Sequence, residues 1–471
     1  MKKSTKIIVG VIAVLILAYG IGVFYYSSHF LNNTMINGED YSNQSAAKVE
    51  EDIRSRVKGY ELKITERKGL KDSVKGSDID LTFLENGAIT KLQEQQNAFV
   101  WPMHLFGSGD EATIEIVSYD EAKLDQLFDK FNCFKKKNVT APASARPVYA
   151  GKNTYKIQAE VEGNKVRKEQ FKEEVIDCIN NAKESLDIEE AGCYMVPKYR
   201  KGDEEITKLK EDMEKLVKGS VTYDYSNRYI AEIEGLKDNK YVVDGDITHK
   251  FIKIKDHTKA YISKDAVEDW LIEYALDTNT LYGNRKFKSH RGTIINVYNG
   301  PYGWRMDVEK ETKAIMKMMK NGTKKTREPY YKQKGMPNTN GQLNDIGGDY
   351  VEVDMSYQMV YVYKNGKQVY TSSCVTGNTS LGRGTHTGTG CIQFKQRDKV
   401  LGGPGYDYAS PVSYWMPFYM GEGLHDATWR SSFGGSIYKT NGSHGCVNLP
   451  LYAAAAIYDI VEAGWPVVCY Y

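Results

Sequence analysis

The sequence predicts a multidomain chain with one transmembrane helix, α+β modules in the middle and a mainly β domain at the C-terminal end. Three observations lead to this fold class. The length of 471 residues is enough for two to four domains. An uncharged run covers residues 7–26. Beyond it, helical periodicity alternates with strand patterns, and a strong hairpin pattern opens the part of the chain that starts at residue 348.

The composition is that of a globular protein. Charged residues make up 26% of the chain and hydrophobic residues 41%. The net charge of +2 gives no indication of a nucleic-acid partner. The 35 tyrosines fit half-buried β-faces, and they also fit surfaces that stack on sugars. Both interpretations of the tyrosines stay open, and the sequence does not specify an oligomeric state.

The N-terminal residues predict the compartment. Lys2, Lys3 and Lys6 precede the uncharged run over 7–26, whose 20 residues would span roughly 30 Å, about one hydrocarbon core. Lysines on this flank predict that residues 1–6 stay in the cytoplasm and that the rest of the chain lies outside. The alternative is a cleaved signal peptide, but residues 24–29 contain no small-x-small site. We therefore expect an uncleaved single-pass anchor in the cell membrane.

Residues 27–75 are expected to form a juxtamembrane unit, with a helix over 45–57 and a strand over 62–65. Residues 76–205 and 206–330 are expected to form two α+β modules. The elements expected in these modules are strands over 112–117, 155–161 and 294–298, and helices over 119–131, 168–185, 204–217, 264–275 and 309–319.

A Gly-, Asn-, Lys- and Pro-rich linker is expected over 331–347, followed by a separate domain over 348–471. In that domain, strands over 359–363 and 367–371 flank the dipeptide Asn365-Gly366, which is a strong hairpin signal. A helix from about 452 to 463 and a closing strand over 466–471 complete the expected elements.

One motif in this last domain carries chemistry. The run from Ser443 to Asn448 reads Ser-His-Gly-Cys-Val-Asn, and seventeen residues separate it from His425. A cysteine thiol is a weak nucleophile until a base or a cation favours its thiolate. A histidine, a spacer of this length and Ser/Thr-His-Gly-Cys-x-Asn or Arg resemble the signature of the L,D-transpeptidase, or YkuD-like, catalytic domain. The resemblance covers about residues 348–471.

The resemblance implies a role for each residue of the motif. Cys446 would be the nucleophile and His425 its base and acid, as a thiolate–imidazolium pair would allow. A backbone carbonyl at Ser443 would orient His425. The backbone N–H groups of Gly445 and Cys446 would form the oxyanion hole, and His444 would shape the pocket or assist the oxyanion.

Further residues are candidates for substrate binding or for packing. Tyr414 and Trp415 precede His425 and are expected to line the acyl-donor groove or to pack in the core. Asn448 is expected to bond or pack the cysteine loop. His386 stands where the family commonly has a proline, and we expect no catalytic role for it. No HExxH or Cys/His cluster with metal-ligand spacing occurs, so no metal and no cofactor are predicted.

The resemblance implies a membrane-anchored acyltransferase acting on peptidoglycan stem peptides and forming 3→3 cross-links, with sensitivity to carbapenems. The middle region resembles the peptidoglycan-binding modules that precede this domain in Gram-positive enzymes, and a simple spacer remains an equal alternative. Three other functions stay open: an L,D-carboxypeptidase, attachment of a protein to the wall, and a non-catalytic wall-binding protein.

Overall fold

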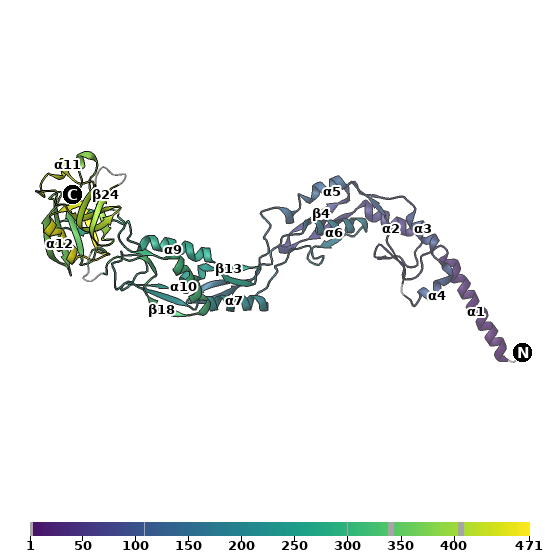
Figure 1. Cartoon of the computed structure of the whole chain (residues 1–471). Coiled ribbons are helices and arrows are strands. Elements are labelled where there is room, and N and C mark those ends of the chain that lie inside the picture. The colour runs from purple at the N-terminus through teal and green to yellow at the C-terminus, as the bar shows by residue number, and fades with distance from the viewer. Residues whose placement is uncertain (1–2, 108, 299, 338–342, 404–408) are drawn as a thin grey trace. The chain divides into compact units, whose positions relative to one another are not determined.

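The computed structural model describes residues 3–107, 109–298, 300–337, 343–403 and 409–471 (Figure 1). The chain divides into two compact units. Unit 1 comprises Met1–Arg146 and Gln158–Asp203, and unit 2 comprises Pro147–Ile157 and Glu204–Tyr471.

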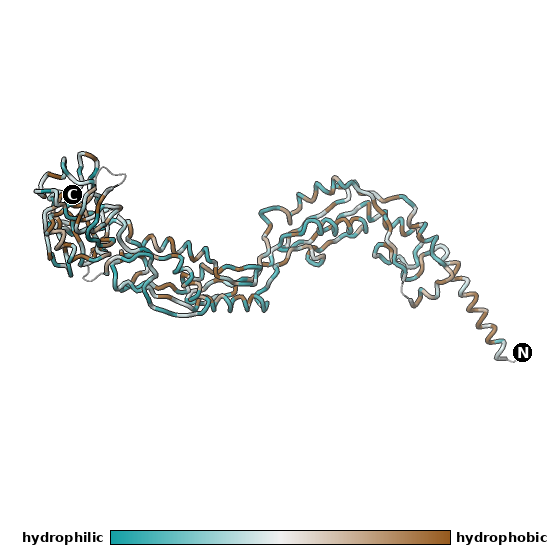
Figure 2. Tube along the Cα trace, viewed as in Figure 1, coloured by the Kyte–Doolittle hydropathy of each residue, from teal (hydrophilic) through white to brown (hydrophobic). Residues whose placement is uncertain are grey.

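Unit 1 begins with the helix α1 (Lys3–Tyr26). Among the described residues it is the one helix long and apolar enough to cross a membrane, with Ser4–Tyr26 meeting both conditions. Figure 2 shows most of the trace of α1 in the hydrophobic colour. The run expected over 7–26 therefore forms the predicted helix, while residues 1–2 of the expected tail lie outside the described residues.

The part of unit 1 that follows α1 forms a small core of its own. Helix α2 (Ala46–Lys58) starts at the N-cap Ser45, whose side chain accepts a backbone N–H of the first turn. Its buried residues Val49, Ile53 and Val57 repeat at helical spacing. The other elements here are β1 (Met35–Ile36), β2 (Glu39–Asp40), β5 (Thr82–Phe83), α3 (Ala88–Gln95), η3 (Ala98–Val100), α4 (Trp101–His104), β6 (Glu111–Ala112) and β7 (Val117–Ser118).

The strand expected over 112–117 is replaced by the two short strands β6 and β7. The strand is interrupted because the side chain of Asn37, which is distant in sequence, binds the backbone of Ile114. The amide of Asn37 accepts the N–H of Ile114 at 2.8 Å and donates to its carbonyl at 2.9 Å, so it takes the place of a ladder partner.

The second core of unit 1 lies between a three-stranded sheet and two helices. Its elements are β3 (Glu61–Thr65), β4 (Lys71–Lys75), α5 (Glu121–Phe128), α6 (Lys168–Asn180) and β10 (Ser185–Asp187), in the sheet order β10-β3-β4. Leu62 and Val74 pack in the same core as Phe171. The boundary expected at residue 75 is therefore not a break in packing, and the helices expected over 119–131 and 168–185 are present but shorter.

Unit 2 begins with a module built on the sheet β12-β11-β18. Its buried Glu311 accepts the hydroxyl of Tyr223 at 2.9 Å and pairs with Arg327, which ties helix α10 to the sheet. The elements are β8 (Arg146–Gly151), β9 (Thr154–Gln158), α7 (Glu204–Leu216), β11 (Ser220–Asp224), β12 (Lys240–Val243), α8 (Gly245–Thr248), β13 (Ile252–Lys255), β14 (Lys259–Ile262), α9 (Lys264–Thr278), α10 (Val308–Asn321) and β18 (Lys324–Arg327). Residues of β8 and β9 fall in both units.

A hairpin of β15 (Arg285–Lys288) and β16 (Ile294–Val297) packs this module against the C-terminal domain. Arg285 forms a buried ion pair with Asp345. The segment expected as a linker over 331–347 is thus partly structured: β19 (Tyr331–Gln333) pairs with β17 (Arg305–Met306), and Asp345 is buried. Residues 338–342 of that segment lie outside the described residues.

The C-terminal domain is a sandwich of two sheets around one core. The five-stranded sheet has the order β22-β21-β20-β28-β23, and the four-stranded sheet has the order β24-β25-β26-β27. The expected hairpin is present, with Asn365 at φ 53° and Gly366 at φ 73° in its turn. The elements are β20 (Tyr350–Asp354), β21 (Met359–Lys364), β22 (Lys367–Ser373), β23 (Gly388–Cys391), β24 (Gln396–Gly402), β25 (Ala409–Tyr419), β26 (Glu422–Asp426), α11 (Tyr438–Asn441), β27 (Val447–Leu449), α12 (Leu451–Ile460) and β28 (Pro466–Tyr470).

Candidate active site

Two neighbouring strands bring the motif histidine and cysteine together. β26 and β27 are parallel, and their register pairs His425 with Asn448. Cys446 immediately precedes β27, two residues before the partner of His425. Both side chains line one cleft of about 190 Å³. The cleft is lined by Leu401, Ser410, His425, Trp429, Arg430, Gly442, Ser443, His444, Cys446 and Asn448.

The loop that carries Cys446 is braced by Ser443. The Ser443 hydroxyl donates to the carbonyl oxygen of Cys446 at 2.5 Å and accepts the N–H of Gly445 at 3.0 Å. Gly445 has φ +128°, a conformation that favours glycine. A Cβ at this position would lie 2.9 Å from a carboxylate oxygen of Glu422. The loop therefore needs both the hydroxyl at 443 and the missing side chain at 445.

A neighbouring backbone carbonyl orients the histidine. His425 is buried, and its Nδ1 lies 2.8 Å from the carbonyl oxygen of Asp426. Because a carbonyl only accepts, Nδ1 carries the proton and Nε2 keeps its lone pair. The expected orienting group was the Ser443 carbonyl, but that oxygen accepts the N–H of Asn378 at 2.9 Å. The orienting role therefore belongs to Asp426.

Burial shifts the pKa values of both His425 and Cys446 in the direction that disfavours the charged form. It lowers the pKa of His425 to about 4, with the nearby Asp426 carbonyl and carboxylate opposing the shift. Burial also raises the pKa of the Cys446 thiol to about 12, with the N–H of Gly423 opposing and the carboxylate of Glu422 adding to it. Both shifts favour a thiol and a neutral imidazole over the thiolate–imidazolium pair.

Comparisons with known proteins agree with this geometry. Residues 348–469 match the family model of the L,D-transpeptidase catalytic domain, and residues 203–327 match that of the "Putative peptidoglycan binding domain". The catalytic domain of the Enterococcus faecium L,D-transpeptidase is 37% identical, over 26% of this chain and 96% of that chain, with a TM-score of 0.24. The chain belongs to the L,D-transpeptidase family.

Two longer solved structures are also similar to this L,D-transpeptidase. A cysteine-to-serine mutant of the Enterococcus faecium L,D-transpeptidase is 28% identical, over 55% of this chain and 98% of that chain, with a TM-score of 0.44. An L,D-transpeptidase from Mycobacterium smegmatis is 25% identical, over 26% of this chain and 59% of that chain, with a TM-score of 0.23. A search of curated proteins finds no match. The predicted family, its mainly β catalytic domain and a peptidoglycan-binding domain are thereby confirmed.

The two N–H groups that were expected to form an oxyanion hole differ in their hydrogen bonding. The N–H of Gly445 already donates to Ser443, which leaves the N–H of Cys446 as the remaining donor of the expected pair. His444 is exposed at the rim of the cleft and is hydrogen-bonded to Arg383. This position fits a pocket-shaping role for His444.

Tyr414 and Trp415 do not line the cleft. Trp415 is buried and its ring centroid lies 5.8 Å from that of His425, so it packs behind the histidine. Tyr414 packs against Tyr458. The expected alternative of core packing applies to both. By contrast, Asn448 does line the cleft, and its buried Oδ1 has no partner among the described residues.

Three residues at the site were missed from the sequence. Trp429 and Arg430 follow His425 on the next loop and line the cleft. Glu422 precedes it and lies against the cysteine loop. The sequence signal that could have identified these three residues is their closeness in the chain to His425. His386, for which no catalytic role was expected, donates its backbone N–H to Glu422 at 3.0 Å and lies outside the cleft lining.

Proposed function

We propose that this chain is a peptidoglycan L,D-transpeptidase that forms 3→3 cross-links through a thioester at Cys446. The observation that carries the proposal is the shared cleft of His425 and Cys446 in a domain of this family. The other cysteines fit less well, because Cys374 and Cys469 are fully buried in the core. Each of the seven cysteines is free in the structure.

The first half-reaction transfers an acyl group to sulfur. The Cys446 sulfur attacks the carbonyl of the third stem residue while its proton passes to Nε2 of His425. The resulting imidazolium then gives this proton to the nitrogen of the departing D-alanine. The C–N bond breaks, the C–S bond remains as a neutral thioester, and His425 returns to its neutral form.

The second half-reaction transfers the acyl group to an amine. A neutral side-chain amine on a neighbouring stem attacks the thioester carbonyl, and Nε2 of His425 takes one of its protons. The C–S bond then breaks and the leaving sulfur takes that proton back. The products are an amide cross-link and the free Cys446 thiol.

Groups around the cleft support binding of such a donor. The N–H of Cys446 serves as a donor to the oxyanion. The unpartnered Oδ1 of Asn448 can accept a peptide N–H. The guanidinium of Arg430 lines the same cleft, and burial lowers its pKa. A cation in this position fits the terminal carboxylate of a stem tetrapeptide.

We also propose that α1 is retained as an anchor, with residues 1–6 in the cytoplasm and the catalytic domain at the cell wall. The end of α1 is bonded into the folded unit, which supports an uncleaved anchor over a signal peptide. The Tyr26 hydroxyl donates to Asn43 at 2.7 Å, and Gln96 donates to the Tyr26 carbonyl at 3.1 Å. The modules between anchor and catalytic domain would hold peptidoglycan or act as a spacer.

The test is incubation of the purified full chain with a disaccharide tetrapeptide. The proposal predicts 3→3 dimers and release of D-alanine with the wild type, and neither product with Cys446→Ala. A tripeptide as the dominant product would assign an L,D-carboxypeptidase instead. Transfer only to an added protein amine would assign protein attachment, and no product at all would leave a wall-binding protein.

A further inference from the structure

A short segment beside the end of α1 exposes large apolar side chains. Residues 98–106 comprise η3, α4 and the turn after it, and we refer to them as the docked segment. The exposed fractions are 65% for Phe99, 73% for Met103, 41% for Leu105 and 94% for Phe106. Four such residues within eight positions are unusual on a surface that faces only water.

Trp101 fixes the docked segment to α1. Its indole N–H donates to the carbonyl of Tyr19 at 3.2 Å, and the Tyr19 hydroxyl donates to the carbonyl of Phe99 at 2.9 Å. The indole also stacks on Tyr26, with ring centroids 5.9 Å apart. A Cβ at Gly22 would lie 2.2 Å from the indole, so the missing side chain of Gly22 makes room for this contact.

The far end of the segment is held as well. The side-chain amide of Asn33 donates to the carbonyl of His104 at 3.0 Å and to that of Gly107 at 3.3 Å. The amide of Asn32 donates to the same His104 carbonyl at 3.2 Å. These bonds leave the exposed apolar side chains with little freedom to fold back onto the unit.

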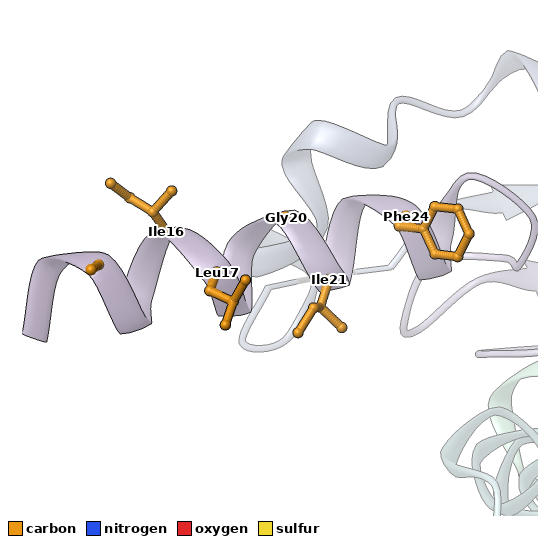
Figure 3. Close-up of a pocket in the computed structure, with 6 residues that line it drawn as sticks. Ile16, Leu17, Gly20, Ile21 and Phe24 are labelled. Carbon is orange, nitrogen blue, oxygen red and sulfur yellow. The ribbon is translucent and has the colours of Figure 1, made fainter. Parts of the chain in front are cut away.

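The contacts of the docked segment with Tyr19 and Tyr26 determine its position along the axis of α1. Tyr19 and Tyr26 are separated by about 10 Å along the helix axis at 1.5 Å per residue. They mark the outer third of the apolar run, where the acyl chains meet the headgroups. Ile21 and Phe24 project from α1 over this stretch, and Ile16 and Leu17 project just before it (Figure 3); all four side chains are exposed.

We propose that the docked segment lies in the outer membrane–water interface of the same bilayer that α1 spans, with its four apolar side chains among the acyl chains. The inference rests on the proposed anchor. Tyr and Trp at the level of the headgroups and apolar side chains 5–10 Å deeper are the usual arrangement at such an interface. The segment then holds the first module of the chain close to the membrane surface.

The test uses a new tryptophan at the most exposed position. Phe106→Trp is made in the full chain, reconstituted in vesicles of phosphatidylglycerol and phosphatidylcholine with or without bromine on the acyl chains. The emission added by Phe106→Trp is expected to lose about half or more of its intensity to the brominated lipid. The new tryptophan side chain should also be shielded from acrylamide, a quencher that is dissolved in the water.

A second reporter separates this inference from the anchor. Ile16→Trp places a tryptophan in the middle of α1 and must be quenched if α1 spans the bilayer. Quenching of Ile16→Trp without quenching of Phe106→Trp would overturn the docked segment alone. No quenching of either would overturn the anchor. Shielding from acrylamide without quenching by bromine would mean that a protein covers the segment, which also contradicts the proposal.

A matched pair of glycine variants tests the docking itself. Gly22→Ala adds a methyl group where the indole of Trp101 lies, whereas Gly20→Ala adds the same group where no atom lies within 4 Å. In the Phe106→Trp background, Gly22→Ala is expected to reduce the quenching by brominated lipid and Gly20→Ala to leave it unchanged. Equal quenching in both variants would contradict the role of Trp101.

Discussion

The Nδ1 atom of His425 lies 2.8 Å from the carbonyl oxygen of Asp426, while the Asp426 carboxylate accepts the backbone N–H groups of Ser413 and Tyr414 at 2.8 Å each. The residue next to the histidine therefore orients it through its backbone. Its side chain joins β26 to β25 and is no third member of a catalytic triad.

This relationship predicts a contrast between two substitutions of Asp426. Asp426→Asn keeps an oxygen for the two N–H groups and leaves the backbone carbonyl in place, so acylation should stay within a few-fold of wild type. Asp426→Ala leaves two partly buried donors unpaired, at up to about 1–3 kcal/mol each, and should lower both thermal stability and activity. Carbapenem acylation rates and melting curves measure both effects. A loss of about 10⁴-fold in Asp426→Asn, as for a triad aspartate, would contradict the assignment.

The raised pKa of the Cys446 thiol predicts how its alkylation depends on pH. Because burial raises the pKa of Cys446 to about 12, the thiolate fraction should increase about tenfold per pH unit across the neutral range. Iodoacetamide alkylation of Cys446, followed by peptide mass spectrometry, should therefore rise without a plateau between pH 5 and pH 9. A plateau that begins below pH 6 would instead reveal a thiolate–imidazolium pair.

Glu422 should change how the rate of Cys446 alkylation depends on pH. Burial raises the pKa of its carboxyl to about 7, with the His386 N–H opposing the shift. Above this pH the ionised carboxylate disfavours negative charge on the neighbouring sulfur. Glu422→Gln should therefore speed alkylation several-fold at pH 8, up to about tenfold if the thiol pKa falls by one unit. At pH 5 it should match wild type, because Glu422 is then protonated.

The same carboxyl predicts how stability changes with pH. A pKa raised from 4.5 to about 7 in the folded state means that folding favours the protonated form. Its contribution is complete below pH 4.5 and is lost as the pH rises towards 7. Glu422→Gln should therefore melt at a higher temperature than wild type at pH 8 but not at pH 4.5. The exposed Glu462→Gln serves as the control, and an equal shift in both variants would contradict the assignment.

The buried ion pair between the β15–β16 hairpin and the segment before the catalytic domain predicts a large stability effect. The side chains of Arg285 and Asp345 are 3% and 1% exposed. Asp345→Ala leaves the guanidinium buried without its carboxylate, which should destabilise unit 2 by about 3–5 kcal/mol. The exposed pair of Glu309 and Lys313 gives the control, since Glu309→Ala should have a much smaller effect on stability. Urea unfolding of the detergent-solubilised chain measures both, and equal costs would show that Asp345 is not a structural contact.

Elements with strong local signals could be predicted from the sequence. The apolar N-terminal helix, the helix after Ser45 and the Asn365-Gly366 hairpin each follow from composition, periodicity or turn chemistry. That Cys446 and His425 come together in one cleft followed from the residue types and spacing of the motif. Each of these features is determined by residues that are close together in the sequence.

Features that depend on distant partners could not be predicted. Asp345 looked like part of a linker because its partner Arg285 is 60 residues away. Asn37 interrupts a strand that begins more than 70 residues later. The uncharged state of Cys446 and His425 depends on how deeply the fold buries them, which the motif does not encode. The Ser443 carbonyl was expected at His425 because the sequence does not show that Asn378 occupies it.

The most direct test of the central claim is the intact mass of the full chain after brief exposure to a stem tetrapeptide donor without an acceptor. The account predicts an added mass equal to the donor minus D-alanine, located by peptide mapping at Cys446 and absent from Cys446→Ala. An unchanged mass, or the same adduct in Cys446→Ala, would contradict it.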